Sequence, residues 1–316
     1  MGRGPKAGGD AGVIAAVRPP RVRQALDEAT TRLRVMGVAT ARPDAEWLLG
    51  RVLGVPRLTL YAEPRRTLGA AEASGFQALV ERRAAGEPLQ YLLGFEEFCG
   101  LRLRVTSDVL VPRPETEGLV AWALEVLASR PRATAADVGT GSGAIACALA
   151  SGHSGVRLVA LDRSSPALQV AADNVASLGL ASRIALVAGD GLDPLRRCEP
   201  GLDLVVANPP YLPTGSLASL PSEVVNHEPR IALDGGPDGM ALARRLVAEA
   251  PRVLARGGAL LMEIGEGQAA PLREAMAAAG LSTIEARRDL AGVERYLGGR
   301  RPGAAAGAER RSGRAC

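Results

Sequence analysis

The stretch VVANPPYLP, residues 205–213, joins an apolar run to residues that can hold a planar polar group. The run predicts a buried strand that ends at Asn208, because the prolines that follow cannot donate to a sheet ladder. The Asn208 side-chain oxygen and the Pro209 carbonyl can each accept one N–H of a primary amide, and Tyr211 offers a ring for stacking. With Pro210 stiffening the turn, this arrangement could aim a weakly nucleophilic amide nitrogen at an electrophilic methyl group. A rigid turn without chemistry explains the tetrapeptide alone equally well.

A second stretch, DVGTGSGAIACALA over residues 137–150, predicts a strand, a glycine-rich turn and a helix. Gly139, Gly141 and Gly143 let the backbone turn tightly and approach a ligand closely, and the helix that follows presents its N-terminal amides. The segment GSGAIA also satisfies the dinucleotide pattern Gly-x-Gly-x-x-Ala, and such turns occur without ligands. The stretch therefore predicts a nucleotide-type site and does not choose the nucleotide.

Two carboxylates end the next two predicted strands. Asp162 ends VRLVALD, where a carboxylate can accept hydrogen bonds from both hydroxyls of an adenosine ribose. The alternative for Asp162 is a helix N-cap, a role that Ser164 or Ser165 fits better. Asp190 ends IALVAGD and could accept from an adenine amino group, although an aspartate before a glycine is more often a turn residue. With Asn208, these groups give polar signals at the ends of four successive strands, which favours one ligand site.

The elements that must position these groups fall into two regions. Apolar residues three and four apart, in segments that end at glycines, predict a small all-helical region before residue 86. From about Pro114, strand and helix patterns alternate, which predicts a doubly wound, mostly parallel α/β sheet with its ligand at the carboxyl ends of the strands. The expected segments are a disordered basic tail 1–20, a helical N-terminal domain 21–86, a linker with a β-hairpin 87–113, a catalytic domain 114–299 and a second disordered basic tail 300–316.

Composition excludes several classes of function. The 316 residues are 47% hydrophobic, without an apolar run as long as a membrane span or a convincing secretion signal, so we expect a cytoplasmic protein that does not bind membranes. Residues 1–23 and residues 297–316 each carry a net charge of +4, whereas the whole chain carries +4. The body between them therefore carries −4 and does not suggest nucleic-acid binding. The cysteines 99, 147, 198 and 316 lack zinc-site spacing, so reduced thiols and no metal are expected.

Six blocks that occur in order give the chain a resemblance to a known family: YLLGFEEFCGLRLRV, VLVPRPETEGLV, DVGTGSGAIA, NPPYLP, EPRIALDGGPDGM and RRDLAGVERY. Together they resemble the HemK/PrmC family of peptide-chain release factor glutamine methyltransferases over roughly residues 25 to 298. The resemblance implies a Rossmann-like methyltransferase domain that uses S-adenosyl-L-methionine. It also implies class 1 release factors as partners, docked by the helical domain, with the glutamine of their Gly-Gly-Gln motif as the acceptor.

The same resemblance assigns roles to individual residues. The methionine part of the cofactor would lie against the glycine turn, its ribose against Asp162 and its adenine between Asp190 and Gly191. The residues implied for the methionine part are Gly139, Thr140, Gly141, Ser142 and Gly143, and those implied for the substrate glutamine are Asn208, Pro209, Pro210 and Tyr211. Two positions depart from the family pattern. Gly191 replaces a bulky residue that often covers the adenine, which could weaken cofactor binding, and Cys99 replaces an aromatic residue, which leaves a contact at the hairpin in doubt.

Other functions remain open at this point. A glutamine methyltransferase acting on a large-subunit ribosomal protein shares the same motifs. A nucleic-acid amino-methyltransferase would need a basic groove and a pocket for a flipped base, which the acidic body does not favour. A dehydrogenase would leave NPPY without a role, and a non-catalytic binding module would leave a complete set of reactive residues unused.

Overall fold

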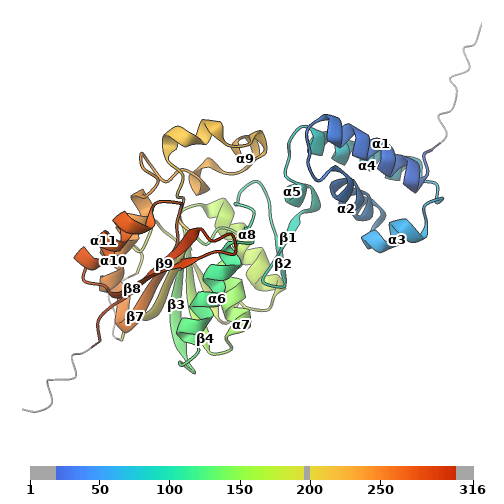
Figure 1. The fold of residues 1–316 in the computed structure, drawn as a ribbon. Helices are drawn as coiled ribbons and strands as arrows, with labels where there is room; N and C mark the ends of the chain where they lie inside the picture. The colour runs from blue at the N-terminus through green and yellow to red at the C-terminus, as the bar shows by residue number, and fades with distance from the viewer. Residues whose placement is uncertain (1–18, 196–199, 304–316) are drawn as a thin grey trace, which may run out of the picture. The chain divides into compact units, whose positions relative to one another are not determined.

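The computed structural model describes residues 19–195 and 200–303 (Figure 1). Most of the two expected tails, together with Cys198 and Cys316, lies outside the described residues. The chain divides into two compact units, Met1–Ala85 and Gly86–Cys316. Within the described residues, no helix is long and apolar enough to cross a membrane.

The first unit is built from helices whose apolar faces pack together. Its elements are α1 (Val22–Val35), α2 (Ala41–Leu53), α3 (Arg57–Ala62) and α4 (Ala70–Ala84). Leu33, Leu48 and Leu49 are fully buried among these helices. The Arg83 guanidinium and the Asp44 carboxylate form a buried ion pair, with 2.7 Å between Nε and Oδ2. Because an unpaired charge would be costly at this depth, the two side chains hold α4 and α2 in one register.

The second unit begins with a short helix and a hairpin and continues as a seven-stranded sheet. The first elements are α5 (Leu89–Leu93), β1 (Phe95–Phe98) and β2 (Leu101–Arg104), and the strands of the large sheet are β3 (Ala133–Val138), β4 (Val156–Asp162), β5 (Ile184–Ala188), β6 (Leu202–Ala207), β7 (Leu254–Glu263), β8 (Ser282–Arg288) and β9 (Glu294–Arg300). The strand order is β5-β4-β3-β6-β7-β9-β8, and β3 to β7 are parallel. The order reverses direction between β3 and β6, so the sheet has a topological switch point there.

Helices cover both faces of this sheet (Figure 1). The long helices are α6 (Thr116–Leu127), α7 (Ala144–Gly152), α8 (Ser165–Ser177), α10 (Ala241–Val253) and α11 (Ala269–Ala278), and the short ones are η1 (Thr214–Ser219), α9 (Ser222–His227) and η2 (Arg230–Ala232). One apolar core includes buried side chains of α6 and α7, and the other includes those of α10 and α11. A sheet that is buried on both faces needs nearly continuous apolar strands, which is the pattern that the sequence shows.

Among the seven described strands of this sheet, β9 alone runs in the opposite direction to the others. β9 pairs antiparallel with both β7 and β8 and lies between them. The Tyr296 hydroxyl on β9 donates to the Glu115 carbonyl, directly before α6. A Cβ at Gly118 would lie 2.2 Å from that hydroxyl oxygen, so only glycine allows this approach. The predicted fold class, a helical domain followed by a hairpin and a doubly wound sheet, is confirmed.

Candidate functional site

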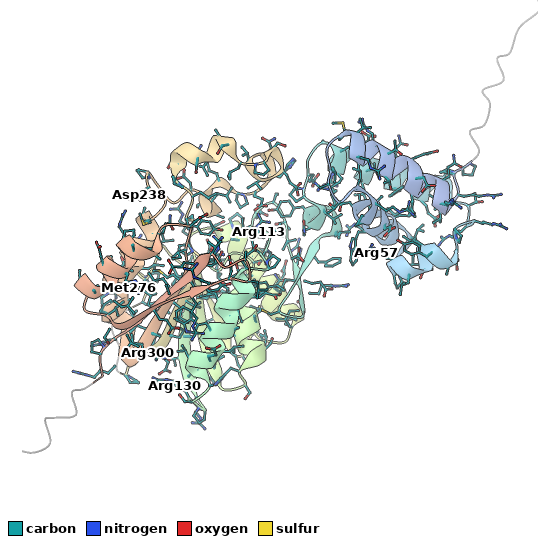
Figure 2. The ribbon with its side chains drawn as sticks, viewed as in Figure 1. Arg57, Arg113, Arg130, Asp238, Met276 and Arg300 are labelled. Atoms are coloured by element: carbon teal, nitrogen blue, oxygen red, sulfur yellow. The ribbon has the colours of Figure 1, made fainter. Side chains whose placement is uncertain are left out.

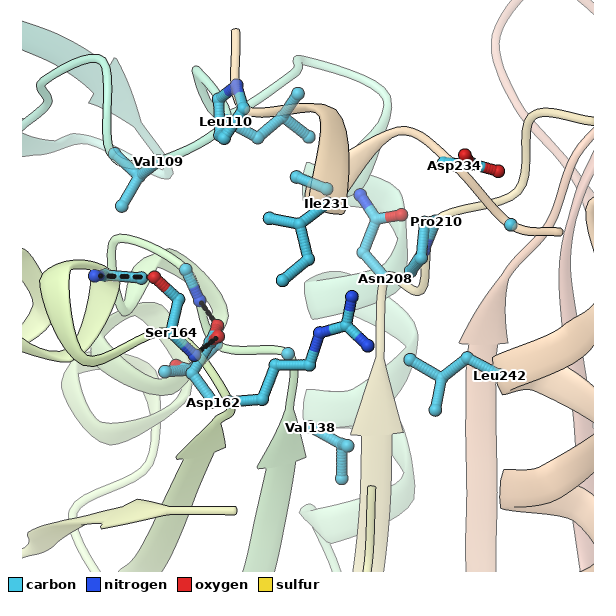
Figure 3. Close-up of a pocket in the computed structure, with 18 of the residues that line it drawn as sticks. Val109, Leu110, Val138, Asp162, Ser164, Asn208, Pro210, Ile231, Asp234 and Leu242 are labelled. Atoms are coloured by element: carbon cyan, nitrogen blue, oxygen red, sulfur yellow. Dashed lines mark hydrogen bonds between the residues drawn. The ribbon is translucent and has the colours of Figure 1, made fainter. Parts of the chain in front are cut away.

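A cavity of about 500 Å³ opens at the carboxyl ends of the parallel strands, around the switch point of the sheet (Figure 3). Its walls come from the ends of β3 and β4, the loops after β3, β4, β5 and β6, the residues before α6 and the start of α10. Arg113 lines this cavity, whereas Arg130 pairs with Asp203 at the other end of the strands (Figure 2). In open α/β sheets, ligands bind at the edge where this cavity lies.

The glycine turn forms the floor of the cavity after β3. Gly139, Thr140, Gly141 and Ser142 line it, whereas Gly143 does not. Gly139 and Gly141 have φ angles of 73° and 54°, and a Cβ at either position would meet no atom within 4 Å. The turn is therefore left-handed at both glycines, and its backbone is open to a ligand.

Asp137 supports this turn from beneath. Its Oδ2 accepts hydrogen bonds from the Thr140 hydroxyl at 2.7 Å and from the Ala146 amide at 3.1 Å. Asp137 is completely buried, and this burial raises the pKa of its carboxyl to about 7. The side chain therefore ties the turn to the first turn of α7 and fixes the direction of the helix N-terminus.

Asp162 lies at the end of β4 and faces the cavity with both carboxylate oxygens already in use (Figure 3). Its Oδ2 accepts from the Gly141 amide at 2.8 Å, and its Oδ1 accepts from the Ser164 amide at 2.9 Å. Ser164 is the N-cap of α8 and accepts from the Ala167 amide, as the sequence favoured. Because an ionised carboxylate has about four acceptor positions, Asp162 keeps capacity for the hydroxyls of a sugar.

Asp190 and Gly191 line the cavity after β5, beside a side chain that the sequence did not single out. The Arg245 Nη1 atom donates to the Asp190 carboxylate at 2.7 Å, and its Nη2 donates to the Asp190 carbonyl at 2.9 Å. Hydrogen bonds to Glu249, Asp190 and Asp193 raise the pKa of Arg245. A Cβ at Gly191 would lie 3.2 Å from Arg245 Cζ, so the guanidinium occupies the space that a larger residue would take.

Asn208 follows β6 and lines the cavity on another wall (Figure 3). Its Nδ2 donates to the Thr116 hydroxyl at 3.1 Å, and that hydroxyl donates to Glu263 Oε2 at 2.6 Å. No described residue donates a hydrogen bond to Asn208 Oδ1. The side chain is thus held by its nitrogen, and its oxygen remains available to a ligand.

The remaining residues of NPPY lie at different depths. Pro210 lines the cavity, whereas Pro209 and Tyr211 do not. Pro209 is buried, and Tyr211 is half-buried, with its carbonyl accepting from Gln268 Nε2 at 2.9 Å. Burial raises the pKa of the Tyr211 hydroxyl. The structure therefore brings Asn208 and Pro210 to the cavity wall, and the stacking role of Tyr211 stays a prediction.

On the wall opposite the strand ends, an ion pair joins two segments that are far apart in the sequence. The Arg113 Nη2 atom, before α6, lies 2.6 Å from Glu228 Oε1, directly after α9. Glu228 is buried, and its Oε2 has no hydrogen-bond partner among the described residues. Pro229 and Ile231, which follow it, line the cavity. This ion pair fixes the segment that covers the cavity.

Comparison with known proteins adds two matches to family models and several close relatives. Residues 24–94 match the model of the PrmC N-terminal domain, and residues 121–236 match that of the methyltransferase small domain. The release factor glutamine methyltransferase of Moorella thermoacetica is 47% identical over 259 residues, which cover 82% of this chain and 90% of that protein. The chain belongs to this family. The protein of the same name from Geobacter sulfurreducens is 41% identical, over 88% of this chain and 96% of its own.

One similar solved structure supports the fold alone. The hMettl16 catalytic domain in complex with MAT2A 3′UTR hairpin 1 has a TM-score of 0.53 and 18% identity, and the match covers 76% of this chain and 83% of that one. The family resemblance found in the sequence is confirmed by the relatives, and the chain is a methyltransferase.

Sequence reasoning missed several members of the site in this methyltransferase. Thr116 lies inside the PRPETE block, and Glu263 ends the last parallel strand, but neither was singled out. Arg245, on α10, was not singled out either. An acidic residue at the end of GALLME, in line with the other strand ends, was the one signal that could have identified Glu263.

Proposed function

We propose that this protein transfers a methyl group from S-adenosyl-L-methionine to the side-chain amide nitrogen of the glutamine in the Gly-Gly-Gln motif of class 1 peptide-chain release factors, in the cytoplasm. The proposal rests on the side-chain amide of Asn208 at the cavity wall. Its Nδ2 atom donates a hydrogen bond to Thr116, and its Oδ1 atom is therefore available to accept a hydrogen bond from a ligand. A primary amide supplies two N–H donors in one plane, which is the complement of such an acceptor. The names of the close relatives support the choice of release factors.

The cavity residues fit the proposed cofactor. Open backbone at Gly139 and Gly141 suits close contact with the methionine part, and the free acceptor positions of Asp162 suit the two ribose hydroxyls. Asp190 and the neighbouring Arg245 would flank the adenine. When bound, the cofactor supplies an electrophilic methyl group on a positively charged sulfur.

The contribution of the protein to this reaction is mainly positioning. An amide nitrogen is a weak nucleophile because its lone pair is delocalised into the carbonyl. Asn208 Oδ1 and the Pro209 carbonyl would each accept one N–H of the glutamine and so fix the plane of its NH₂ group. Tyr211 would stack on that plane. Holding the nitrogen in line with the methyl group removes much of the entropic barrier.

The first unit would serve docking. Its helices include exposed large apolar side chains, among them Leu58 and Tyr61. Contacts of the release factor body with this unit would select the substrate through surfaces other than the reacting glutamine. The ribosomal-protein alternative shares the same chemistry and differs only in what docks.

The test is methyl transfer from labelled S-adenosyl-L-methionine with release factor, large-subunit ribosomal protein and DNA offered side by side. We expect label in the release factor and its loss when the glutamine of the Gly-Gly-Gln motif is replaced by alanine. Undiminished labelling of that alanine variant would refute the assigned acceptor. Preferential labelling of the ribosomal protein would favour the alternative substrate.

A further inference from the structure

Three side chains from separate elements form a continuous hydrogen-bonded row that begins at the cavity wall, where two of them, Asn208 and Thr116, line the cavity. Asn208, after β6, donates from Nδ2 to Thr116 Oγ1 at 3.1 Å. Thr116, the first residue of α6, donates its hydroxyl to Oε2 of Glu263 at 2.6 Å, and Glu263 is the last residue of β7. Thr116 is 4% exposed and Glu263 is 1% exposed, so water does not compete for these bonds.

The direction of this row follows from counting protons. An ionised carboxylate can only accept, and a threonine hydroxyl has a single proton to give. Once Thr116 donates to Glu263, its oxygen can only accept from Asn208. The side-chain amide of Asn208 must therefore turn its NH₂ group toward Thr116. Its oxygen is then the group offered to the cavity, where no described residue donates to it.

We propose that Thr116 and Glu263 are positioning residues for methyl transfer, which act by fixing the orientation of the Asn208 amide; this inference rests on the proposed function. In the opposite orientation, Asn208 would present N–H donors to the N–H donors of the substrate glutamine. That arrangement repels the substrate amide and leaves its plane undefined. Because Thr116 donates to a carboxylate, its oxygen is a stronger acceptor for the Asn208 N–H. This polarises the Asn208 amide and makes its Oδ1 a stronger acceptor.

The surroundings of Glu263 make the row sensitive to pH. Burial raises the pKa of the Glu263 carboxyl to about 7, and the groups that face it have opposing effects on it. The Thr116 hydroxyl, Arg295 and Arg113 lower the pKa, while Glu115 raises it. The hydroxyls of Tyr211 and Tyr296 also lie close enough to interact with this carboxyl. Protonated Glu263 no longer requires the Thr116 proton, so the orientation of Asn208 is lost as the pH falls through about 7.

The experiment measures the methyl-transfer kinetics of the full-length protein with release factor and labelled S-adenosyl-L-methionine. Thr116→Val keeps the shape of the side chain and removes the hydroxyl. We expect it to lower kcat roughly 10–100-fold, less than the loss of the acceptor itself, with the Kd of the cofactor within about twofold. Thr116→Ser restores the hydroxyl and should recover most of that rate. A role that depends only on the shape and methyl group of Thr116 would give the opposite result, with Thr116→Val close to the wild-type kcat and Thr116→Ser impaired.

A pH profile provides the second readout. The kcat of the wild type should fall on the acid side of about pH 7, and Glu263→Gln should lower kcat and remove that fall. Glu274→Gln, an exposed carboxylate on α11, serves as the matched control and should follow the wild type. Thermal unfolding shows whether Thr116→Val is folded. If it is not, the pH profiles of kcat for the wild type and Glu263→Gln decide whether the positioning role holds.

The outcomes separate the inference from the function on which it rests. A wild type that does not label the release factor refutes the proposed function. A wild type that labels it, together with an unchanged kcat for Thr116→Val or an acid limb retained in Glu263→Gln, refutes the positioning role alone.

Discussion

Replacing Asp162 by alanine should weaken cofactor binding for two reasons, because this carboxylate both supports the glycine turn and offers acceptor positions to the cavity. The carboxylate accepts from the Gly141 amide at 2.8 Å and from the Ser164 amide at 2.9 Å, so it holds the glycine turn beside the start of α8. Its remaining acceptor positions face the cavity and would receive the ribose hydroxyls. Alanine removes the sugar acceptor and leaves both amides without their partner.

The size of the effect follows from the charge of the acceptor. A hydrogen bond to a charged group contributes about 1.5–3 kcal/mol, and every 1.4 kcal/mol is about tenfold in Kd, so the loss of one ribose bond raises the Kd roughly 10–150-fold. Asp162→Asn is not a mild substitute, because its NH₂ group would face either the Gly141 amide or the Ser164 amide. We therefore expect a loss similar to that of the alanine variant.

Isothermal titration calorimetry with S-adenosyl-L-methionine and its demethylated product measures this directly. Glu274→Gln, remote from the cavity, controls for the removal of a carboxylate. A Kd for Asp162→Ala within twofold of the wild type would show that the ribose does not lie against this side chain. Binding of NAD in place of S-adenosyl-L-methionine would overturn the whole cofactor assignment.

Three further predictions concern catalysis, docking and stability. Asn208→Ala should lower the methyl-transfer rate roughly 10²–10³-fold, with a smaller change in cofactor affinity. Tyr211→Phe should retain more of that rate than Tyr211→Ala, because stacking needs the ring. Steady-state kinetics test both predictions. Deletion of residues 1–85 should leave cofactor binding largely intact and raise the KM for release factor, so unchanged KM in the folded truncation would exclude docking by the first unit. The raised pKa values of Asp137 and Glu263, both about 7, mean that these carboxyls bind protons more tightly in the folded chain, so the free energy of unfolding should decrease as the pH rises from about 4 to above 7. Urea titrations at pH 5 and pH 8 measure this decrease, and in Glu263→Gln roughly 2–3 kcal/mol of it should disappear.

The sequence predicted the fold well because local patterns encode it. Apolar runs marked β3 to β7, and glycines marked the ends of the long helices of the first unit. The start of β7 was missed, since its first residues, Leu254 to Gly257, mix arginine and glycine and pair across a register shift with β6. The short helices α3, α5 and α9 carry too few residues to show a helical period.

The site was predictable only in part, for a physical reason. Asp162 and Asn208 are found at strand ends, and the switch point brings strand ends together. Thr116 and Glu263 are joined by a hydrogen bond although 147 residues separate them in the chain. A contact between residues so far apart produces no hydrophobic periodicity or short motif, so it cannot be predicted from one sequence. Whether Pro209 and Tyr211 contact the substrate is decided by the substrate itself, so those roles stay predictions.

The place of β9 in the sheet has a consequence for synthesis of the chain. β9 is the last of the described strands to be synthesised, yet it lies between β7 and β8, and its Tyr296 hydroxyl donates to the carbonyl of the residue before α6. Until it emerges, the edge of β7 has no partner on that side, and unpaired edges recruit strands from other molecules. A chain that stops short of residue 294 should therefore aggregate, and should not accumulate as an inactive monomer. The central strands of the sheet can therefore all be synthesised before the strand that covers the edge of β7 is available.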